Sequence, residues 1–386
     1  MNTDTGNHKI LYILNVANKV NNFSYSSMLA AKECGFEFHI AGNWGYSSLQ
    51  EQKADEEKYG IKIHQIDFIR TPYHLKNIKA YKQLVRLIKE EKIDYIHCNT
   101  PIGGLLGRLA GKKCRVKKVI YQAHGFHFYK GAPKLNWLLY YPIERLLARY
   151  TDAIITINKE DFAFSREEFK LRNNGKIHYV RGVGIDLSQY TVDCEENTSI
   201  RNKKRNELGI EKDDIVLISA GRLDINKNNE TTIRALANVP NVKFLLCGDG
   251  DCREKLMSLA EKLGVSDKVL FLGNRSDIND LYLASDIMVM MSFREGLSRS
   301  IMEAMASGLA CIVSKIRGNV DLIEHKKGGY LCQATDVNNL SKYIETLAVD
   351  ISLKKEYGEF NQNKIKLFGV DCIVDEIKKI YKETFY

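Results

Sequence analysis

The sequence predicts an α/β protein made of two Rossmann-like, doubly wound domains. Short apolar runs alternate with longer amphipathic stretches in both halves, the pattern of strands and helices in parallel sheets. The chain has 386 residues, more than a single hydrophobic core usually organises, so two domains are expected. Its composition, 44% hydrophobic and 27% charged with 5 prolines, is that of a soluble protein folded almost throughout.

The first half contains seven apolar runs of strand length. These predicted strands are Lys9–Asn15, Glu37–Ala41, Lys62–Ile66, Tyr95–Cys98, Lys118–Gln122, Ala153–Thr156 and Lys176–Val180. Helices are expected between them. Ile78–Glu91 has apolar residues at three- and four-residue intervals, and Pro101–Lys112 opens with a proline, which suits a first helical position.

The second half repeats the alternation after a polar stretch. Leu187–Ile200 has no apolar periodicity and is predicted to be a linker, followed by a basic helix over Arg201–Leu208. The predicted strands are Ile215–Ser219, Val242–Cys247, Val269–Leu272, Ile287–Met291 and Ala310–Ser314. We therefore expect domains over residues 1–190 and 200–367, with a last helix at about 368–386 crossing back to the first domain.

Several classes of protein are disfavoured by composition. No apolar run approaches the roughly 18 residues that span a bilayer, and Met1–His8 is polar, so a cytoplasmic protein is expected. The nine cysteines are scattered without a C-x-x-C pair, which argues against a zinc cage or a disulfide framework.

The positive charge lies in the first half. Residues 1–190 hold 29 Lys and Arg against 18 Asp and Glu, and the remainder holds 28 against 30. A basic half can face nucleic acid, anionic lipid or a phosphorylated substrate, or can simply keep the surface solvated. No nucleic-acid-binding motif accompanies the charge, so no nucleic-acid partner is predicted.

Two strands of the second half end in glycine turns that suit a phosphate. Ile215–Ser219 runs into Gly221 and Arg222, with Lys227 five positions further on, so both cations could reach one diphosphate. Val242–Cys247 ends at Gly248. Each element alone also fits a solvated turn or a tight connection.

The most informative segment follows the strand at Ile287–Met291. Glu295 and Gly296 lie on its loop, Ser298 can cap a helix, and Glu303 falls inside that helix. The backbone N–H groups of the first turn form an anion site. Glu303 sits among apolar residues, and a carboxylate in such company normally has a specific partner.

These motifs resemble the donor-site signature of the retaining glycosyltransferase family 4, which has the GT-B fold of two domains facing across a cleft. The signature consists of Gly221-Arg222 with Lys227, and of Glu295 and Glu303 with seven residues between them. Pieces of the first half resemble the capsular and exopolysaccharide branch of that family: Ile96–Pro101, Ala123–Phe128, Thr151-Asp152 and Gly182–Asp186. Asn99 departs from the family, which often has a second histidine there.

The resemblance implies roles for individual residues. Arg222 and Lys227 would neutralise the diphosphate, and Glu303 would hold the ribose. Glu295 would grip the transferred sugar with the backbone around it. The remaining implied contacts are Gly296, Leu297 and Ser298 to the donor, Gly221 and Gly248 at the strand ends, the turn with Asn274 and Arg275 beside the base, and His124 facing the donor sugar. The alternative for His124 is a histidine bonded within its own loop.

The chemistry of the reaction fits these roles. Breaking a glycosyl-phosphate bond builds negative charge on the diphosphate, which fixed cations and helix N–H groups can stabilise. No Asp-x-Asp follows an apolar strand of the first half, so neither a metal nor another cofactor is predicted. By resemblance the anomeric configuration is retained, and no residue stands out as a covalent nucleophile.

The sequence thus predicts transfer of a sugar from a nucleoside-diphosphate sugar, with a UDP-sugar favoured, to a lipid-diphosphate-linked saccharide in capsular, exopolysaccharide or related glycan synthesis. A sugar-nucleotide 2-epimerase and a non-catalytic sugar-nucleotide-binding subunit are the alternatives. The segment Lys134–Tyr150 mixes aromatic, apolar and basic residues and could rest on an anionic membrane, as a peripheral contact. A core helix is the favoured interpretation, because Pro142 interrupts the pattern.

Overall fold

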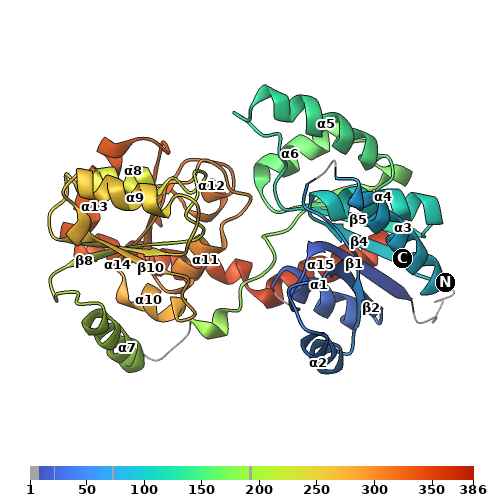
Figure 1. Cartoon of the computed structure of the whole chain (residues 1–386), viewed down its shortest axis with the longest axis horizontal. Helices are drawn as coiled ribbons and strands as arrows, with labels where there is room; N and C mark the ends of the chain where they lie inside the picture. Colours follow the sequence, from blue (N-terminus) through green and yellow to red (C-terminus); the bar gives the residue numbers. More distant parts are fainter. Residues whose placement is uncertain (1–7, 21, 72–73, 191–193) are drawn as a thin grey trace. The chain divides into compact units, whose positions relative to one another are not determined.

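The computed structural model describes residues 8–20, 22–71, 74–190 and 194–386. The chain divides into two compact units (Figure 1). Unit 1 runs to Gly184 and takes in Val370–Tyr386, and unit 2 is Ile185–Gly369. The last helix therefore belongs to the same unit as the first strand.

Unit 1 is built on a seven-stranded parallel sheet in the order β3-β2-β1-β4-β5-β6-β7. Its strands are β1 (Lys9–Val16), β2 (Glu37–Asn43), β3 (Lys62–Gln65), β4 (Tyr95–Asn99), β5 (Lys118–Ala123), β6 (Ala153–Thr156) and β7 (Lys176–Tyr179). All seven predicted strands are confirmed to within two residues at each end. The order reverses between β1 and β4, where ligands of such sheets bind beyond the carboxyl ends of the strands.

Helices cover both faces of this sheet (Figure 1). They are α1 (Asn22–Glu33), α2 (Leu49–Tyr59), α3 (Lys76–Glu90), α4 (Pro101–Cys114), α5 (Lys134–Ala148), α6 (Lys159–Glu168), the 3₁₀ turn η1 (Arg172–Asn174) and α15 (Val370–Phe385). Strand β1 alternates between the two faces: Ile10 and Tyr12 pack with α1 and α15, whereas Leu11 and Ile13 pack with α3 and α4. A strand buried on both faces reads as one continuous apolar run, as β1 does.

Unit 2 repeats the design with a six-stranded parallel sheet in the order β10-β9-β8-β11-β12-β13. Its strands are β8 (Ile215–Ala220), β9 (Val242–Cys247), β10 (Val269–Gly273), β11 (Ile287–Met290), β12 (Ala310–Ser314) and β13 (Gly329–Cys332). The two-domain, doubly wound fold predicted from the sequence is confirmed. Here the strand order reverses between β8 and β11.

The helices of unit 2 also lie on both faces of its sheet. They are α7 (Cys194–Glu207), α8 (Asn229–Leu236), α9 (Arg253–Lys262), α10 (Ile278–Ala284), α11 (Arg299–Ala306), α12 (Asn319–Leu322), α13 (Val337–Val349) and α14 (Ile351–Ile365), with 3₁₀ turns η2 (Leu187–Gln189), η3 (Ser266–Lys268) and η4 (Lys366–Phe368). Buried side chains of α8, α9 and α13 join one core layer, and those of α10 and α11 join the other.

One prediction for this unit is wrong, and one strand was not predicted. The expected linker is partly helical, because α7 begins at Cys194. This helix is held by charge more than by an apolar stripe: Arg201 Nη2 lies 2.7 Å from Asp286 Oδ1, and Arg205 is buried against Asp286. Strand β13 was not predicted, because it has only four residues and its first residue, Gly329, belongs to a Lys-Lys-Gly-Gly stretch that indicates a turn.

Candidate functional site

The two loops at the strand-order reversal of unit 2 are tied together. One loop follows β8 and the other follows β11. Phe293 donates its backbone N–H to Asn226 O at 2.8 Å, and Asn226 Nδ2 donates to Arg294 O at 3.0 Å. Beside these bonds, Lys227 Nζ lies 2.8 Å from Glu295 Oε1. The fold thus brings together two residues from the sequence-predicted site that are 68 positions apart.

Glycines allow the strand ends to approach this closely. Gly221 and Gly248 end neighbouring strands, and Gly221 N–H donates to Cys247 O at 2.9 Å. A Cβ on Gly248, whose φ is +137°, would stand 1.9 Å from Gly221 O. A Cβ on Gly221 would meet Lys227 Cε at 3.2 Å. The Lys227 side chain therefore packs directly against the backbone of Gly221, which has no side chain in the way.

Helix α11 begins at the same edge of the sheet. Its first turn presents backbone N–H groups and the positive end of the helix dipole there. Ser298 occupies the N-cap position, but the predicted capping bond is not made. Its Oγ lies 3.2 Å from both Ser300 Oγ and Met290 Sδ. Burial explains the difference, because the Ser298 side chain faces the core below the helix instead of the helix end.

Glu303 lies inside α11 and is nearly buried, with the specific partners that its apolar surroundings require. Arg299 Nε donates to its Oε1 at 2.7 Å, and Tyr282 OH donates to its Oε2 at 3.1 Å. Burial raises the pKa of Tyr282 well above its usual value, and the neighbouring carboxylate raises it further. The Tyr282 hydroxyl therefore stays protonated and holds Glu303 in place.

Two other cations predicted to contact the donor are paired with carboxylates outside the Lys227–Glu295 pair. Arg222 has a side chain 61% exposed and pairs with Asp251 at 2.9 Å. Arg275 is held by Asp277 at 2.6 Å, and this ion pair draws the pKa of the Asp277 carboxyl well below its usual range. Asn274 is exposed. Their roles at the diphosphate and base remain predictions.

A cation that the sequence analysis missed lies beside Glu295. Arg317, on the loop after β12, is 7% exposed, and its Nε lies 3.4 Å from the backbone oxygen of Glu295. The adjacent Gly318 packs so closely that a Cβ would stand 2.4 Å from Gly296 O. The available signal was a Lys-Ile-Arg-Gly run directly after a buried strand, the same pattern of cation and glycine as at Gly221.

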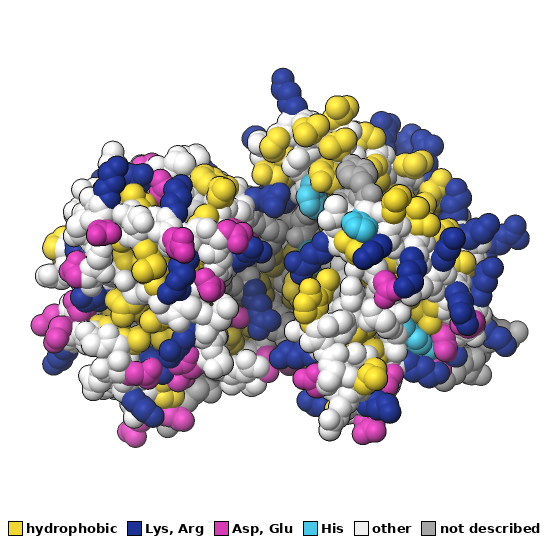
Figure 2. Space-filling model, viewed as in Figure 1, with side chains coloured by type: hydrophobic (Ala, Val, Ile, Leu, Met, Phe, Trp, Pro, Cys, Tyr) yellow, Lys and Arg dark blue, Asp and Glu magenta, His cyan; other side chains and the backbone are white. Residues whose placement is uncertain are grey.

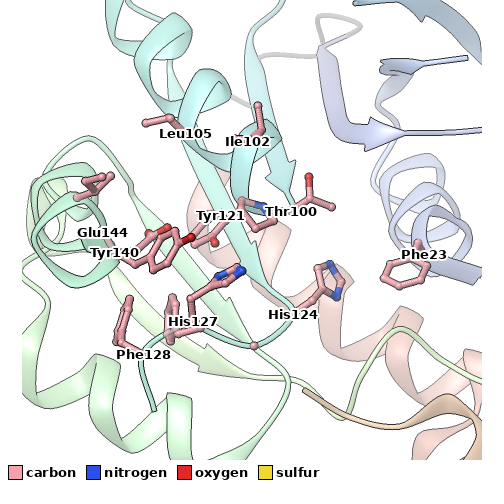
Figure 3. Close-up of a pocket in the computed structure, with 14 residues that line it drawn as sticks. Phe23, Thr100, Ile102, Leu105, Tyr121, His124, His127, Phe128, Tyr140 and Glu144 are labelled. Atoms are coloured by element: carbon pink, nitrogen blue, oxygen red, sulfur yellow. The ribbon is translucent and has the colours of Figure 1, made fainter. Parts of the chain in front are cut away.

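The carboxyl edge of unit 1 carries His124, directly after β5. Its Nε2 lies 3.0 Å from Oδ1 of Asn99, the residue that ends β4. The ring packs edge-on against Phe23, with 5.1 Å between centroids (Figure 3). Because the partner belongs to a neighbouring strand, the alternative of a histidine bonded within its own loop is wrong. Burial lowers the pKa of His124 to about 4, so the imidazole is neutral at physiological pH.

A cavity of about 480 Å³ adjoins His124. Its walls come from α4, from the loop after β5 and from the inner side of α5, as Figure 3 shows. Glu144 of α5 lies in this wall and forms an ion pair with the fully buried Arg108 at 2.8 Å. Arg108 also lies over the ring of Tyr121, 3.8 Å from its centroid.

Helix α5 is a core helix, as the sequence favoured, on one side only, because its other side is exposed. Trp137 and Tyr141 pack against the core of unit 1, and the helix continues through Pro142. The outer side remains exposed, and every exposed side chain of α5 is apolar or basic. Its exposed apolar residues recur at helical spacing and form what we call the α5 stripe: Leu135, Leu138, Leu139, Pro142, Ile143 and Leu146. No helix within the described residues is long and apolar enough to cross a bilayer.

Family models cover most of the chain. The model described as "Glycosyl transferase 4-like" matches residues 9–158, and "Glycosyl transferases group 1" matches residues 200–364. The chain is 35% identical over 357 residues to the putative glycosyltransferase EpsD of Bacillus subtilis, covering 91% of this chain and 90% of that protein.

More distant relatives share most of their length with this chain. An Escherichia coli UDP-Gal:α-D-GlcNAc-diphosphoundecaprenol α-1,3-galactosyltransferase is 29% identical, with 80% of each chain covered. The crystal structure of Anabaena HepE with UDP and glucose aligns with a TM-score of 0.78 at 22% identity, covering 97% of this chain and 100% of that one. The chain therefore belongs to the family 4 glycosyltransferases, enzymes of the GT-B fold.

Proposed function

We propose that this protein is a retaining glycosyltransferase that moves a sugar from a nucleoside-diphosphate sugar to a lipid-diphosphate-linked saccharide. One observation carries the donor half of the proposal. Lys227 and Glu295 meet at 2.8 Å on the carboxyl edge of the unit 2 sheet, where α11 also begins. The reversal of strand order thus brings together a cation, a helix N-terminus and a carboxylate. This combination suits the binding of a sugar diphosphate.

Each charge has a role in the departure of the diphosphate. The Lys227 ammonium would stabilise the negative charge that develops on the phosphate oxygen, together with the first-turn N–H groups of α11. Glu295 would accept hydrogen bonds from hydroxyls of the transferred sugar. Glu303, held by Arg299 and Tyr282, would do the same for the ribose. Transfer with these groups requires neither a metal nor another cofactor.

The relatives favour a particular donor and acceptor. The Escherichia coli relative is named for a UDP-galactose donor and a diphosphoundecaprenol acceptor, and a Campylobacter jejuni relative, 26% identical, is named for a diphospho-undecaprenol acceptor. We infer a UDP-sugar donor, an undecaprenyl-diphosphate-type acceptor and a role in capsular, exopolysaccharide or related glycan synthesis.

The α5 stripe supports a peripheral contact with an anionic membrane on the cytoplasmic side. Leu138 is 71% exposed and Leu135 is 61% exposed, and Arg145 and Arg149 lie exposed near the end of the helix. Figure 2 shows hydrophobic side chains gathered over this helix with Lys and Arg nearby. An apolar helix face with exposed arginines near its end suits the interface of an anionic leaflet.

A transfer assay tests the proposal. A panel of UDP- and GDP-sugars is incubated with synthetic sugar-diphospholipid acceptors, with and without EDTA, and the product's anomeric configuration is read by NMR. We expect transfer from a UDP-sugar, an α-linked product from an α-linked donor, and full activity in EDTA. Inversion or a strict metal requirement would contradict the mechanism.

The same assay separates the alternatives. A sugar-nucleotide 2-epimerase would release an isomerised or free sugar without any acceptor. A non-catalytic binding subunit would bind the nucleotide sugar and turn over neither substrate.

A further inference from the structure

The cavity beside His124 has mainly apolar walls. Its apolar lining residues include Phe23, Ile102, Leu105, Phe126, Phe128 and Ile143. Its volume of about 480 Å³ lies within the ~300–1,000 Å³ range of ligand pockets. It opens at the carboxyl ends of β4 and β5, where ligands of parallel sheets sit.

Two polar side chains of this cavity, His124 and Glu144, already have partners. His124 is bonded to Asn99, and its imidazole is neutral. Glu144 is neutralised by Arg108 at 2.8 Å. A saccharide would bury several hydroxyls, each of which needs a hydrogen-bond partner. Because the walls are mainly apolar, an apolar occupant is favoured over a sugar.

A second cavity of about 480 Å³ adjoins the first and shares five of its lining residues: Phe23, Thr100, Pro101, His127 and Tyr140. It also carries a cation, because the exposed Arg70 lines it. Thr100, common to both cavities, has φ +62°. That conformation is rare for a β-branched residue, and such strain concentrates at ligand sites.

The apolar cavity is continuous with the α5 stripe. Ile143 lines the cavity and is also 39% exposed on the outer side of the helix. An apolar chain that lies along this stripe would therefore meet the cavity at Ile143.

We propose that the apolar cavity receives the first isoprene units of a polyprenyl-diphosphate acceptor, with the diphosphate held by Arg70 in the adjoining cavity. This inference rests on the proposed function for the identity of the acceptor. It assigns the lipid, and not the acceptor sugar, to the walls formed by Leu105, Phe128 and Ile143.

Geranyl diphosphate, which has two isoprene units, tests the assignment by titration calorimetry in a buffer without membranes or detergent. We expect it to bind at least tenfold more tightly than inorganic diphosphate. Leu105→Trp fills the cavity and should remove that advantage. Leu138→Trp adds the same side chain on the outer side of α5 and should leave it intact. Arg70→Ala should weaken both ligands at this site.

Two further variants serve as a second test of the cavity and as a control for the donor site. Ile143→Glu places a carboxylate at an exposed position of the cavity wall, where folding is not at risk, and should match Leu105→Trp. Lys227→Ala removes the donor-site cation and should leave the binding of geranyl diphosphate unchanged. Equal affinities for the two ligands, binding that survives both cavity variants, or binding lost only in Lys227→Ala would overturn the assignment.

This titration needs no sugar transfer, so its outcome is separable from that of the transfer assay. If sugar transfer occurs but the cavity variants bind geranyl diphosphate as well as the wild type does, the proposed function stands and the lipid assignment fails. If the binding of geranyl diphosphate depends on the cavity but no sugar transfer occurs, the lipid-binding cavity stands and the proposed transfer reaction fails.

Discussion

The two units have the same sheet design and opposite chemistry at the edge where ligands bind. Each has a parallel sheet whose order reverses, between β1 and β4 in unit 1 and between β8 and β11 in unit 2. In unit 2 the reversal is crossed by Lys227 and Glu295, with Arg317 beside them. In unit 1 the cavity beside the reversal, beyond β4 and β5, is bordered by aromatic and apolar side chains around a neutral imidazole, and Arg70 lines the adjoining cavity at the end of β1.

This difference shows that topology fixes the place of a site, whereas the side chains on the loops decide what it binds. The charged edge suits a departing diphosphate, whose negative charge grows during the reaction. The apolar edge suits an acceptor whose carrier is a hydrocarbon. The predictions below test whether the two edges are as distinct as this comparison requires.

The largest expected effect is on the stability of unit 1. Arg108→Met leaves the Glu144 carboxylate in an apolar wall without its partner, and breaking a buried pair in this way costs about 3–5 kcal/mol. Denaturant unfolding should show this loss, and Arg108→Met with Glu144→Leu should recover most of it. UDP affinity should be unchanged in the double variant. Wild-type stability of the single variant would mean that the pair is not desolvated.

Next comes the charged edge of unit 2. Lys227→Ala and Glu295→Ala should each lower turnover by on the order of a hundredfold, the loss typical of removing one transition-state contact. Lys255→Ala is the matched control, because Lys255 is 72% exposed and pairs with Glu230 on the same unit. Steady-state transfer rates measure all three variants. Rates near wild type for both Lys227→Ala and Glu295→Ala would mean that the donor site is misplaced.

The sequence predicts the fold well because buried parallel strands are unbroken apolar runs, and twelve of the thirteen strands in the described residues are found in this way. It also predicts Lys227, Glu295 and Glu303, since glycine turns and a carboxylate amid apolar residues are visible locally. The Arg108–Glu144 pair and Arg317 are not, because their partners come from other elements. The exposed side of α5 is hidden for the same reason: periodicity shows that the helix has faces, but not which of them is covered.

The stability of the two units should also depend differently on pH. Burial lowers the pKa of His64 and His124 to about 4 and that of His97 to about 3. The unfolded chain, with values near 6.5, then binds more protons, so their stabilising contribution is complete above pH 6.5 and is lost as the pH falls toward 4. All three lie in unit 1, and unit 2 has only His325.

Hydrogen exchange measured between pH 7 and pH 4.5 should therefore show β4 and β5 losing protection before β8 and β11. His124→Gln should weaken the pH dependence of hydrogen-exchange protection in unit 1 and leave that of unit 2 unchanged. Simultaneous loss in both units, unaffected by the variant, would count against these buried histidines as the cause.

The smallest expected effect is on membrane binding. Leu138→Glu with Leu146→Glu should weaken flotation with anionic liposomes by roughly tenfold, because both side chains lie on the α5 stripe. Leu75→Glu with Ile78→Glu is the control, since both are exposed apolar residues of unit 1 at the start of α3. An equal loss in both pairs would indicate a nonspecific effect of added charge.

The central claim is that the charged edge of unit 2 receives the nucleotide. Hydrogen exchange with and without saturating UDP tests it most directly, because it reports on both units in one experiment. The account predicts protection of residues 221–228 and 295–303, with residues 99–105 unchanged. Protection confined to residues 99–128, or none with either UDP or GDP, would contradict it.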